Sequence, residues 1–172
     1  MTGTFSAMAY PATNFPAISS LIPHRDKMLM LDRVTAAAEE SLTATVTITP
    51  QSMFFDEQEN AVGAWVGIEY MAQAIAAFEG VHALQRGEAV KVGFLLGSRR
   101  YESHCSGFAL GSILQVDVHR VLEHKNGLAA FECRISESDK VLATATVTVF
   151  KPDDVSQFLE KVNGSVNQGG NQ

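Results

Sequence analysis

The chain has 172 residues, of which 46% are hydrophobic and 19% are charged, which suits a single domain with a complete core. The formal net charge is −6 and there is no run of lysines or arginines, which argues against a general affinity for nucleic acid or anionic membranes. No apolar run approaches about 18 residues, so we expect no transmembrane helix.

The two ends of the chain differ from its middle in composition. Residues 1–20 carry no charge and contain proline, serine and threonine, and we expect an extended N-terminal arm with apolar anchors at Phe5, Tyr10 and Phe15. This arm lacks the basic start and continuous apolar segment of a secretory signal, so the expected location is cytoplasmic. In residues 152–172 we expect a short helix, around 155–162, and a disordered tail. Residues 21–151 form the predicted domain.

The predicted domain begins with two strands and a long helix. A short apolar run at 28–34 predicts the first strand, and strict alternation over 41–50 predicts a second strand with one buried face. Residues 63–86 are rich in alanine and stop at Gly87, which is typical of a helix. The apolar positions of the alternating strand are Leu42, Ala44, Val46 and Ile48.

The last third of the domain predicts about four more strands. An apolar run that starts at 90 leads into the first, and alternating segments follow at 114–119, 129–135 and 141–150, with a hairpin signal at Asn126-Gly127. This order of elements indicates an α+β domain in which one antiparallel sheet covers one central helix. Because a second subunit usually closes the free edge of such a sheet, we expect a homodimer at least.

The two cysteines indicate neither a disulfide framework nor a metal site. Two cysteines, Cys105 and Cys133, do not make a disulfide framework in a domain of this size. Cys133 alternates with Phe131 and Ile135, which predicts a position in the core. Neither cysteine has the spacing of a zinc ligand, and we predict no metal site.

One carboxylate stands out in the predicted helix, within the sequence VGIEYMAQ. Glu69 has Trp65, Val66, Ala72 and Gln73 as its helical neighbours. Burial beside Trp65 and Val66, about two turns inside the helix, would favour the protonated carboxyl that a general acid needs. The alternative is a glutamate that faces water near the helix start.

The sequence IPHRDKMLMLDRV, residues 22–34, resembles the opening strand of the hot-dog-fold 3-hydroxyacyl-[acyl-carrier-protein] dehydratases, with the pattern P-H-R-x-P-[FM]-L-L-x-D-R-V. EYMAQ at 69–73 resembles their helix motif E-A-M-A-Q, in which the glutamate is the catalytic acid. Two weaker matches follow. FLLGSRRY at 94–101 is similar to the family's strand after the helix, and Gly111 resembles the glycine of its next turn. Over residues 21–150 the pattern is most similar to the dehydratase-like proteins of aryl-polyene biosynthesis.

The resemblance implies a hot-dog fold, in which an antiparallel sheet wraps around one long central helix. The chain also departs from the family pattern. The family's catalytic histidine lies fourteen residues before the helix glutamate, and this chain has Phe55 there. Lys27 replaces a proline of the first motif. The usual pair of histidine and glutamate is therefore half missing.

The resemblance implies dehydration of a 3-hydroxyacyl thioester, which needs a base beside the carbonyl, an acid at the departing hydroxyl and donors for the enolate oxygen. Glu69 is the expected acid. Because the usual histidine is missing, His24 is the expected base, with His104 as second choice. The backbone N–H groups of Ala64 and Trp65, at the helix start, are the expected oxyanion donors.

Substrate contacts are expected from Phe55 and Gln73. Arg99 and Arg100 form the main basic pair, which family analogy places at the tunnel mouth, where the phosphopantetheine of an acyl carrier protein arrives. The other interpretation is a solvated pair that balances nearby acids. We expect no cofactor, since the substrate is carried on the prosthetic group of the carrier.

Two classes of function follow from these residues. The first is a hydro-lyase that forms trans-2-enoyl thioesters in fatty-acid-like or polyene biosynthesis. The second is a non-catalytic hot-dog subunit that binds acyl chains or pairs with an active dehydratase, as homodimer or heterodimer. A weaker alternative is an acyl thioesterase, since a helix carboxylate can also activate water.

Overall fold

The computed structural model describes residues 14–91 and 93–166. Its strands are β1 (Arg33–Ala37), β2 (Ser41–Thr47), β3 (Phe55–Asp56), β4 (Ala61–Gly63), β5 (Phe94–Ser103), β6 (Gly107–Ala109), β7 (Ile113–Glu123), β8 (Leu128–Glu137) and β9 (Lys140–Phe150). Its helices are α1 (Ile18–Leu21), α2 (Gly67–Gln85) and α3 (Val155–Val166), with the 3-10 turns η1 (Asp26–Met28) and η2 (Ala64–Val66).

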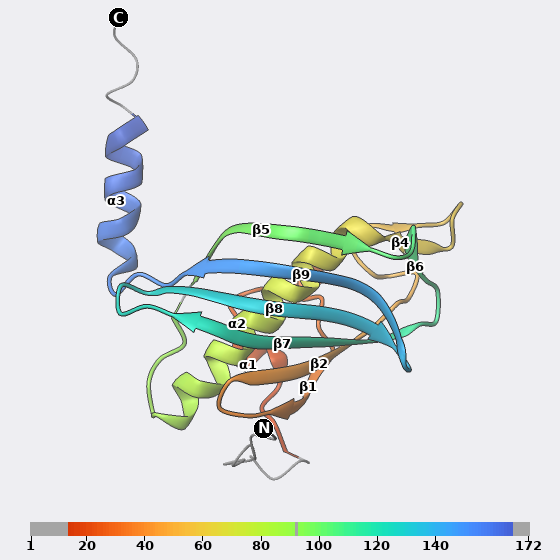
Figure 1. Ribbon diagram of the computed structural model, residues 1–172, viewed down its shortest axis with the longest axis horizontal. Coiled ribbons are helices and arrows are strands. Elements are labelled where there is room, and N and C mark those ends of the chain that lie inside the picture. The colour runs from red at the N-terminus through yellow and green to blue at the C-terminus, as the bar shows by residue number, and fades with distance from the viewer. Residues whose placement is uncertain (1–13, 92, 167–172) are drawn as a thin grey trace, which may run out of the picture.

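One antiparallel sheet forms the body of the molecule. Its six strands run in the order β1-β2-β7-β8-β9-β5, and α2 crosses one face of them (Figure 1). A smaller sheet of β3, β4 and β6 lies beside the start of α2. Because the strand pairs are antiparallel and one long helix packs against the sheet, the domain is α+β, as the sequence predicts.

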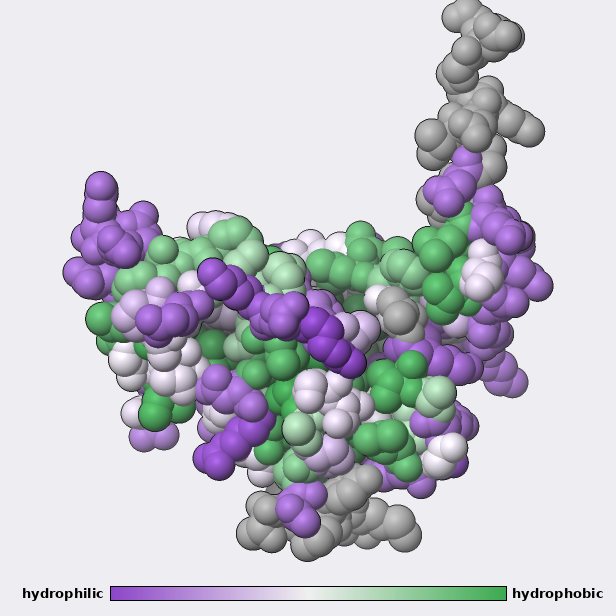
Figure 2. Space-filling view, turned by 180° about the vertical axis from the view of Figure 1, so that it is seen from behind, coloured by the Kyte–Doolittle hydropathy of each residue, from purple (hydrophilic) through white to green (hydrophobic). Residues whose placement is uncertain are grey.

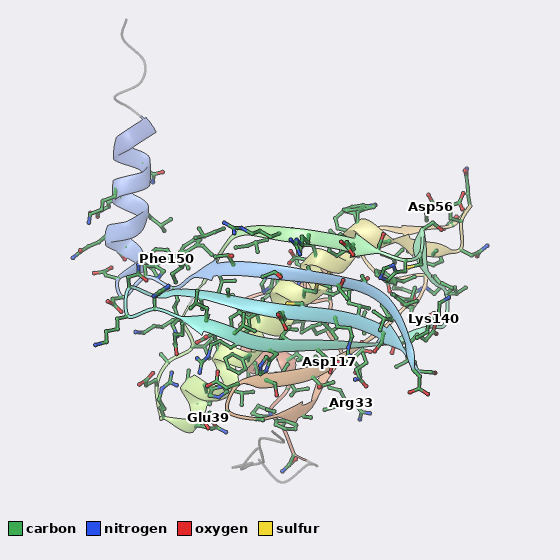
Figure 3. All side chains as sticks on the ribbon, in the orientation of Figure 1. Arg33, Glu39, Asp56, Asp117, Lys140 and Phe150 are labelled. Carbon is green, nitrogen blue, oxygen red and sulfur yellow. The ribbon has the colours of Figure 1, made fainter. Side chains whose placement is uncertain are left out.

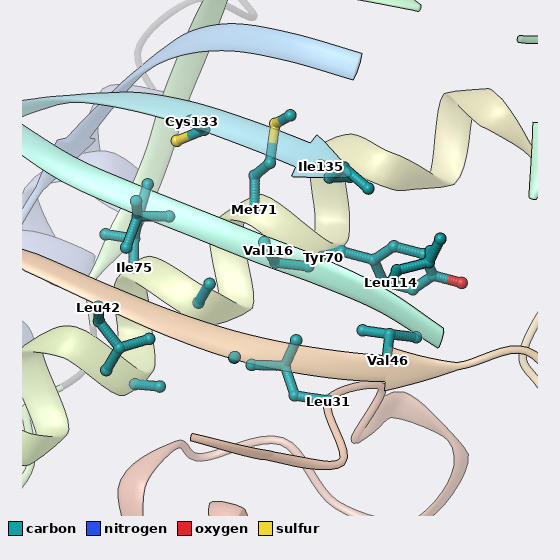
Figure 4. Close-up of a cluster of buried hydrophobic side chains, with 14 of the residues drawn as sticks. Leu31, Leu42, Val46, Tyr70, Met71, Ile75, Leu114, Val116, Cys133 and Ile135 are labelled. Carbon is teal, nitrogen blue, oxygen red and sulfur yellow. The ribbon is translucent and has the colours of Figure 1, made fainter. Parts of the chain in front are cut away.

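The alternation predicted for the second strand is confirmed in β2. Tyr70, Met71 and Ile75 of α2 pack onto the layer that β2 and β7 form (Figure 4). Full burial of such a side chain contributes about 1.5–3 kcal/mol, so this contact sets which face of α2 meets the sheet. Cys133 lies in the same core at 4% exposure, as predicted. The register pairs, each side chain at most 2% exposed, are Leu42–Val118, Ala44–Val116 and Val46–Leu114.

A segment here called the strap, residues 18–32, packs against α2 and carries His24. It begins with α1, whose Ile18 and Leu21 are buried in the core. The folded domain therefore begins before residue 21, where the sequence placed the boundary. The strap approaches α2 closely because residue 80 is glycine: a Cβ there would lie 2.1 Å from the Leu21 carbonyl oxygen.

The first strand also differs from its prediction. The apolar run at 28–34 predicts a strand, but η1 ends at Met28 and β1 begins only at Arg33. Between them, Leu31 is 4% exposed and points into the core. Leu31 and Val34 of this apolar run are buried and Met28 is 43% exposed, and the backbone before Arg33 does not form a strand.

The helix predicted near the C-terminus is α3, which starts at Val155 and extends away from the sheet (Figure 1). The expected anchors Phe5 and Tyr10, and the expected tail after residue 166, lie outside the described residues. Among the helices that the structure describes, none is long and apolar enough to cross a membrane.

Replacement of Gly80 tests the contact between the strap and α2. Gly80→Ala forces the Leu21 backbone away, and such overpacking should lower the free energy of unfolding by about 1–3 kcal/mol. Thermal denaturation should show a Tm several degrees below that of the parent protein. Gln85→Ala is the control, since Gln85 is exposed at the end of the same helix. Equal Tm values for the two variants would contradict the close contact.

Candidate active site

Glu69 lies in the first turn of α2, directly after η2. The sequence placed it about two turns inside one continuous helix, but the α-helix proper begins only at Gly67. The Glu69 side chain is 33% exposed, and Trp65 is 62% exposed and does not bury it in the single chain. Glu69 is thus a partly open carboxyl at a helix start.

Gln73 holds this carboxyl in place. Its Nε2 donates to Oε1 of Glu69 at 3.0 Å and to the Met28 carbonyl at 2.7 Å, while its Oε1 accepts from the Met30 N–H at 2.9 Å. The residue is fully buried. Gln73, expected to contact substrate, is therefore a positioning residue that ties Glu69 and the strap to α2.

The strap brings His24 to Glu69. Nε2 of His24 lies 3.5 Å from Oε1 of Glu69, and the imidazole is 29% exposed. The turn that carries it is fixed by Arg25, whose Nη1 donates to the carbonyls of Ile22 and His24, each at 2.7 Å. Nδ1 of His24 is buried and has no hydrogen-bond partner among the described residues.

The two side chains line a cavity of about 210 Å³. Its walls are mainly apolar and come from the strap, from one stripe of α2 and from the sheet. A carboxyl and an imidazole at the wall of such a cavity can exchange protons with a ligand inside it. The wall residues nearest to this pair in sequence are Pro23, Ala72, Ile75 and Ala76.

The start of α2 offers fewer free donors than the sequence suggested. The Ala64 N–H donates to the Ser106 carbonyl at 3.1 Å, so this amide is used within the fold. The Tyr101 hydroxyl donates to the Ala64 carbonyl. Burial raises the pKa of Tyr101 to about 12, which keeps the phenol protonated as a donor. Of the two expected oxyanion donors, Trp65 is the one that this arrangement leaves as a candidate.

The other expected site residues do not line the cavity of Glu69 in the single chain. Phe55 lies in β3, where it pairs with Val62 and packs against the core. Arg99 and Arg100 are exposed on β5, and Arg100 lines a polar groove on the outside of the sheet. His104 is exposed, just past the end of β5. In the part of the chain that the structure describes, no three His, Cys, Asp or Glu side chains gather as metal ligands would.

The far part of the cavity contains two residues that the sequence did not predict. Glu79 and Lys151 line it and lie 2.5 Å apart, Nζ to Oε2. A signal existed for Glu79, which lies ten positions after Glu69 on the same stripe of the helix as Ala72 and Ala76. Lys151 carried no such signal, because the pair joins residues 72 positions apart.

An antiparallel sheet around one helix defines this chain as a hot-dog protein, and its similarity to known proteins agrees with this. The model of the ApeP-like family, described as ApeP dehydratase, matches residues 16–160, so the chain belongs to that family. A 3-hydroxyacyl-[acyl-carrier-protein] dehydratase FabZ of Pseudothermotoga lettingae is 29% identical over 137 residues, which cover 79% of this chain and 94% of that protein. The predicted family and fold are thus confirmed.

Solved structures give the same result. A chain of the dehydratase heterocomplex ApeI:P from Xenorhabdus doucetiae superposes with a TM-score of 0.80 at 27% identity, covering 87% of this chain and 99% of that chain. The PaaI protein of Escherichia coli, from the phenylacetic acid degradation operon, matches with a TM-score of 0.54 at 14% identity, covering 68% and 80%. The second likeness shows the fold alone.

Replacement of Gln73 tests its positioning role. Gln73→Met keeps the volume but leaves the Met28 carbonyl and the Met30 N–H without their partners, and loss of these partly buried bonds should lower the free energy of unfolding by about 1–3 kcal/mol. Chemical denaturation should show this loss, and amide hydrogen exchange at Met30 should accelerate. Gln85→Met, at the exposed end of the same helix, should change neither quantity. Unchanged exchange at Met30 would show that Gln73 does not hold the strap.

Proposed function

We propose that the protein eliminates water from 3-hydroxyacyl thioesters carried on the phosphopantetheine of an acyl carrier protein, giving trans-2-enoyl thioesters in fatty-acid-like or polyene biosynthesis. The observation that carries this proposal is the 3.5 Å contact between Nε2 of His24 and Oε1 of Glu69 at the wall of an apolar cavity. Family membership and the likeness to a FabZ dehydratase support it. Arg99 and Arg100 remain the candidates for contact with the carrier.

The pair has complementary roles in this reaction. Neutral His24 takes the proton from the carbon beside the thioester carbonyl, and Glu69 gives its proton to the departing hydroxyl, so that water leaves and the double bond forms. Because Gln73 donates to Oε1 of Glu69, Oε2 is the oxygen that carries this proton. Both side chains are partly exposed, at 29% and 33%, so solvent can carry the proton from the imidazolium back to the carboxylate and reset the pair. The Trp65 N–H remains the candidate donor for the enolate oxygen, although Trp65 does not line the cavity of the single chain.

We also propose that a second hot-dog subunit, of the same or another sequence, pairs with β5. Among the described strands β5 pairs only with β9, and its Leu95 and Leu96 are 47% and 56% exposed. Hydrophobic surface lies along this edge of the molecule (Figure 2). A long strand with a free edge and exposed leucines is a template for pairing. The similar ApeI:P chain comes from a heterocomplex.

Phe55 favours a second candidate function. A chain without the family histidine could bind the acyl chain while a partner subunit performs the reaction. The two candidates differ in what they require of Glu69 and His24, which only the first uses for chemistry.

Substitution of the pair tests the first candidate. Glu69→Gln and His24→Ala should each lower kcat/KM for dehydration of a 3-hydroxyacyl-pantetheine thioester by about 10²-fold or more, because each removes a proton-transfer group. Enoyl thioester formation is followed by absorbance, with the protein alone and with its co-purified partner. His104→Ala is the control and should keep the parent rate.

The outcomes separate the assignments. Loss of activity in His104→Ala instead of His24→Ala would show that the base is misassigned. Full activity of both Glu69→Gln and His24→Ala in the complex would make this chain the non-catalytic subunit. Release of free thiol without enoyl product would indicate a thioesterase.

The β5 interface has its own test. Leu96→Lys places a charge at the proposed contact and should shift the protein from dimer to monomer in analytical ultracentrifugation, with the circular dichroism spectrum unchanged. Val121→Lys is the control, since Val121 is similarly exposed at 47% but lies in β7. A dimer that persists in Leu96→Lys would place the interface elsewhere.

A further inference from the structure

The cavity beside His24 and Glu69 runs along α2, and its walls change from apolar to charged at its far end. Ala72 and Ala76 line its middle from the helix side, and Ala129 and Val149 line it from the sheet. These small and apolar side chains leave a channel suited to hydrocarbon. At the far end four charged residues line the same cavity: Glu79, Lys91, Glu123 and Lys151.

Glu79 and Lys151 form a close ion pair in this end. Nζ of Lys151 lies 2.5 Å from Oε2 of Glu79. The Lys151 side chain is only 29% exposed and the Glu79 side chain only 19%. One bond leaves the ammonium with further N–H donors and the carboxylate with a free oxygen. A partly buried pair with unused donors and acceptors is costly to cover with hydrocarbon alone.

The fold holds Lys151 at this place. Its backbone N–H donates to the Gly127 carbonyl at 2.9 Å, in the turn between β7 and β8. Gly127 has a φ of +88°, and a Cβ there would lie 2.1 Å from the Lys151 carbonyl oxygen. Phe150, the residue before, ends β9 beside this turn (Figure 3). The glycine turn therefore fixes the backbone from which the lysine reaches Glu79.

The distance between Glu69 and Glu79 sets the length of the acyl chain that would reach from one end of the cavity to the other. Glu79 follows Glu69 by ten residues of one helix, which corresponds to about 15 Å at the helical rise. An extended chain advances about 3.3–3.6 Å per three bonds, so roughly a dozen bonds span this distance. A thioester held at His24 and Glu69 would place the end of such a chain at the ion pair.

We propose that Glu79 and Lys151 select acyl chains of about this length whose far end carries a neutral hydrogen-bonding group such as a hydroxyl. A hydroxyl accepts from the ammonium and donates to the carboxylate, whereas a methyl end covers both and satisfies neither. Glu79 and Lys151 neutralise each other, which favours a neutral group over a charged one. This inference rests on the proposed function, because it assumes that the reacting end lies at Glu69.

The test compares two 3-hydroxyacyl-pantetheine thioesters of equal length, about a dozen bonds, that end in a hydroxyl or a methyl group. In the protein with its native partner, the hydroxyl-ended thioester should have a kcat/KM about tenfold higher. Unreactive amide analogues without the 3-hydroxyl should show the same preference in Kd by calorimetry. An analogue with a carboxyl end should bind more weakly than the hydroxyl-ended one.

Two double variants assign the preference. Glu79→Gln with Lys151→Met should reduce it to less than about twofold. Asp117→Asn with Arg134→Met removes an ion pair of 3.5 Å that lies away from the cavity and should keep the preference. Asp117 lies on β7 (Figure 3), and it lines the outer groove of the sheet.

The measurements distinguish failure of this inference from failure of the proposed function. Equal Kd values for the two analogues in the parent protein, or no binding of either, would overturn the inference without any variant. A preference that survives in the Glu79/Lys151 double variant would overturn the assignment to these residues. No turnover with the preference retained in Kd would reject the dehydratase and support the selection of the chain end.

Discussion

The buried amide of Gln73 is the contact on which the site depends. It makes three hydrogen bonds, two to backbone groups of the strap and one to Glu69, and it has no exposed surface. A fully satisfied buried amide specifies one arrangement, because any shift leaves polar groups unpaired in a medium that cannot replace water. His24 lies four residues before Met28, so the same bonds that hold the strap also place the imidazole beside the carboxyl.

Much of the fold could be predicted because alternation reports directly on burial. The strand at 41–50, the long helix and the hairpin at Asn126-Gly127 all appear as β2, α2 and the turn between β7 and β8. The apolar run at 28–34 misled because hydrophobicity fixes which side chains are buried, not which backbone groups pair. The Met28 carbonyl and the Met30 N–H bond to a side chain from α2, and that partner is distant in sequence.

The candidate site was predictable where its residues lie one helical turn apart. Glu69 and Gln73 are such a pair, and their contact is in the structure. The proximity of His24 to Glu69 followed from the family resemblance and the missing histidine, and the strap supplies the physical reason. Family analogy suggested Phe55, Arg99 and Arg100, and His104 was the second-choice base because it follows the strand at 94–101. The cavity of the single chain includes none of the four. The pairing of Glu79 with Lys151 depends on where β9 ends, which no local pattern encodes.

β5 connects the cavity beside Glu69 to the proposed partner. Its first residues, Phe94 and Leu95, line the cavity, while its hydrogen bonds within the described sheet come from β9 on one side. An edge strand opens at lower free energy than a central one, so we expect this wall to open more easily than the walls that β8 and β9 form. A second subunit paired with β5 would hold the wall closed, and an acyl chain packed against Phe94 and Leu95 would favour the same closed state. Linkage then requires that each strengthens the binding of the other by an equal factor. A chain that lacks the family histidine can thus still depend on its partner for substrate binding, even where Glu69 and His24 provide the proton transfers.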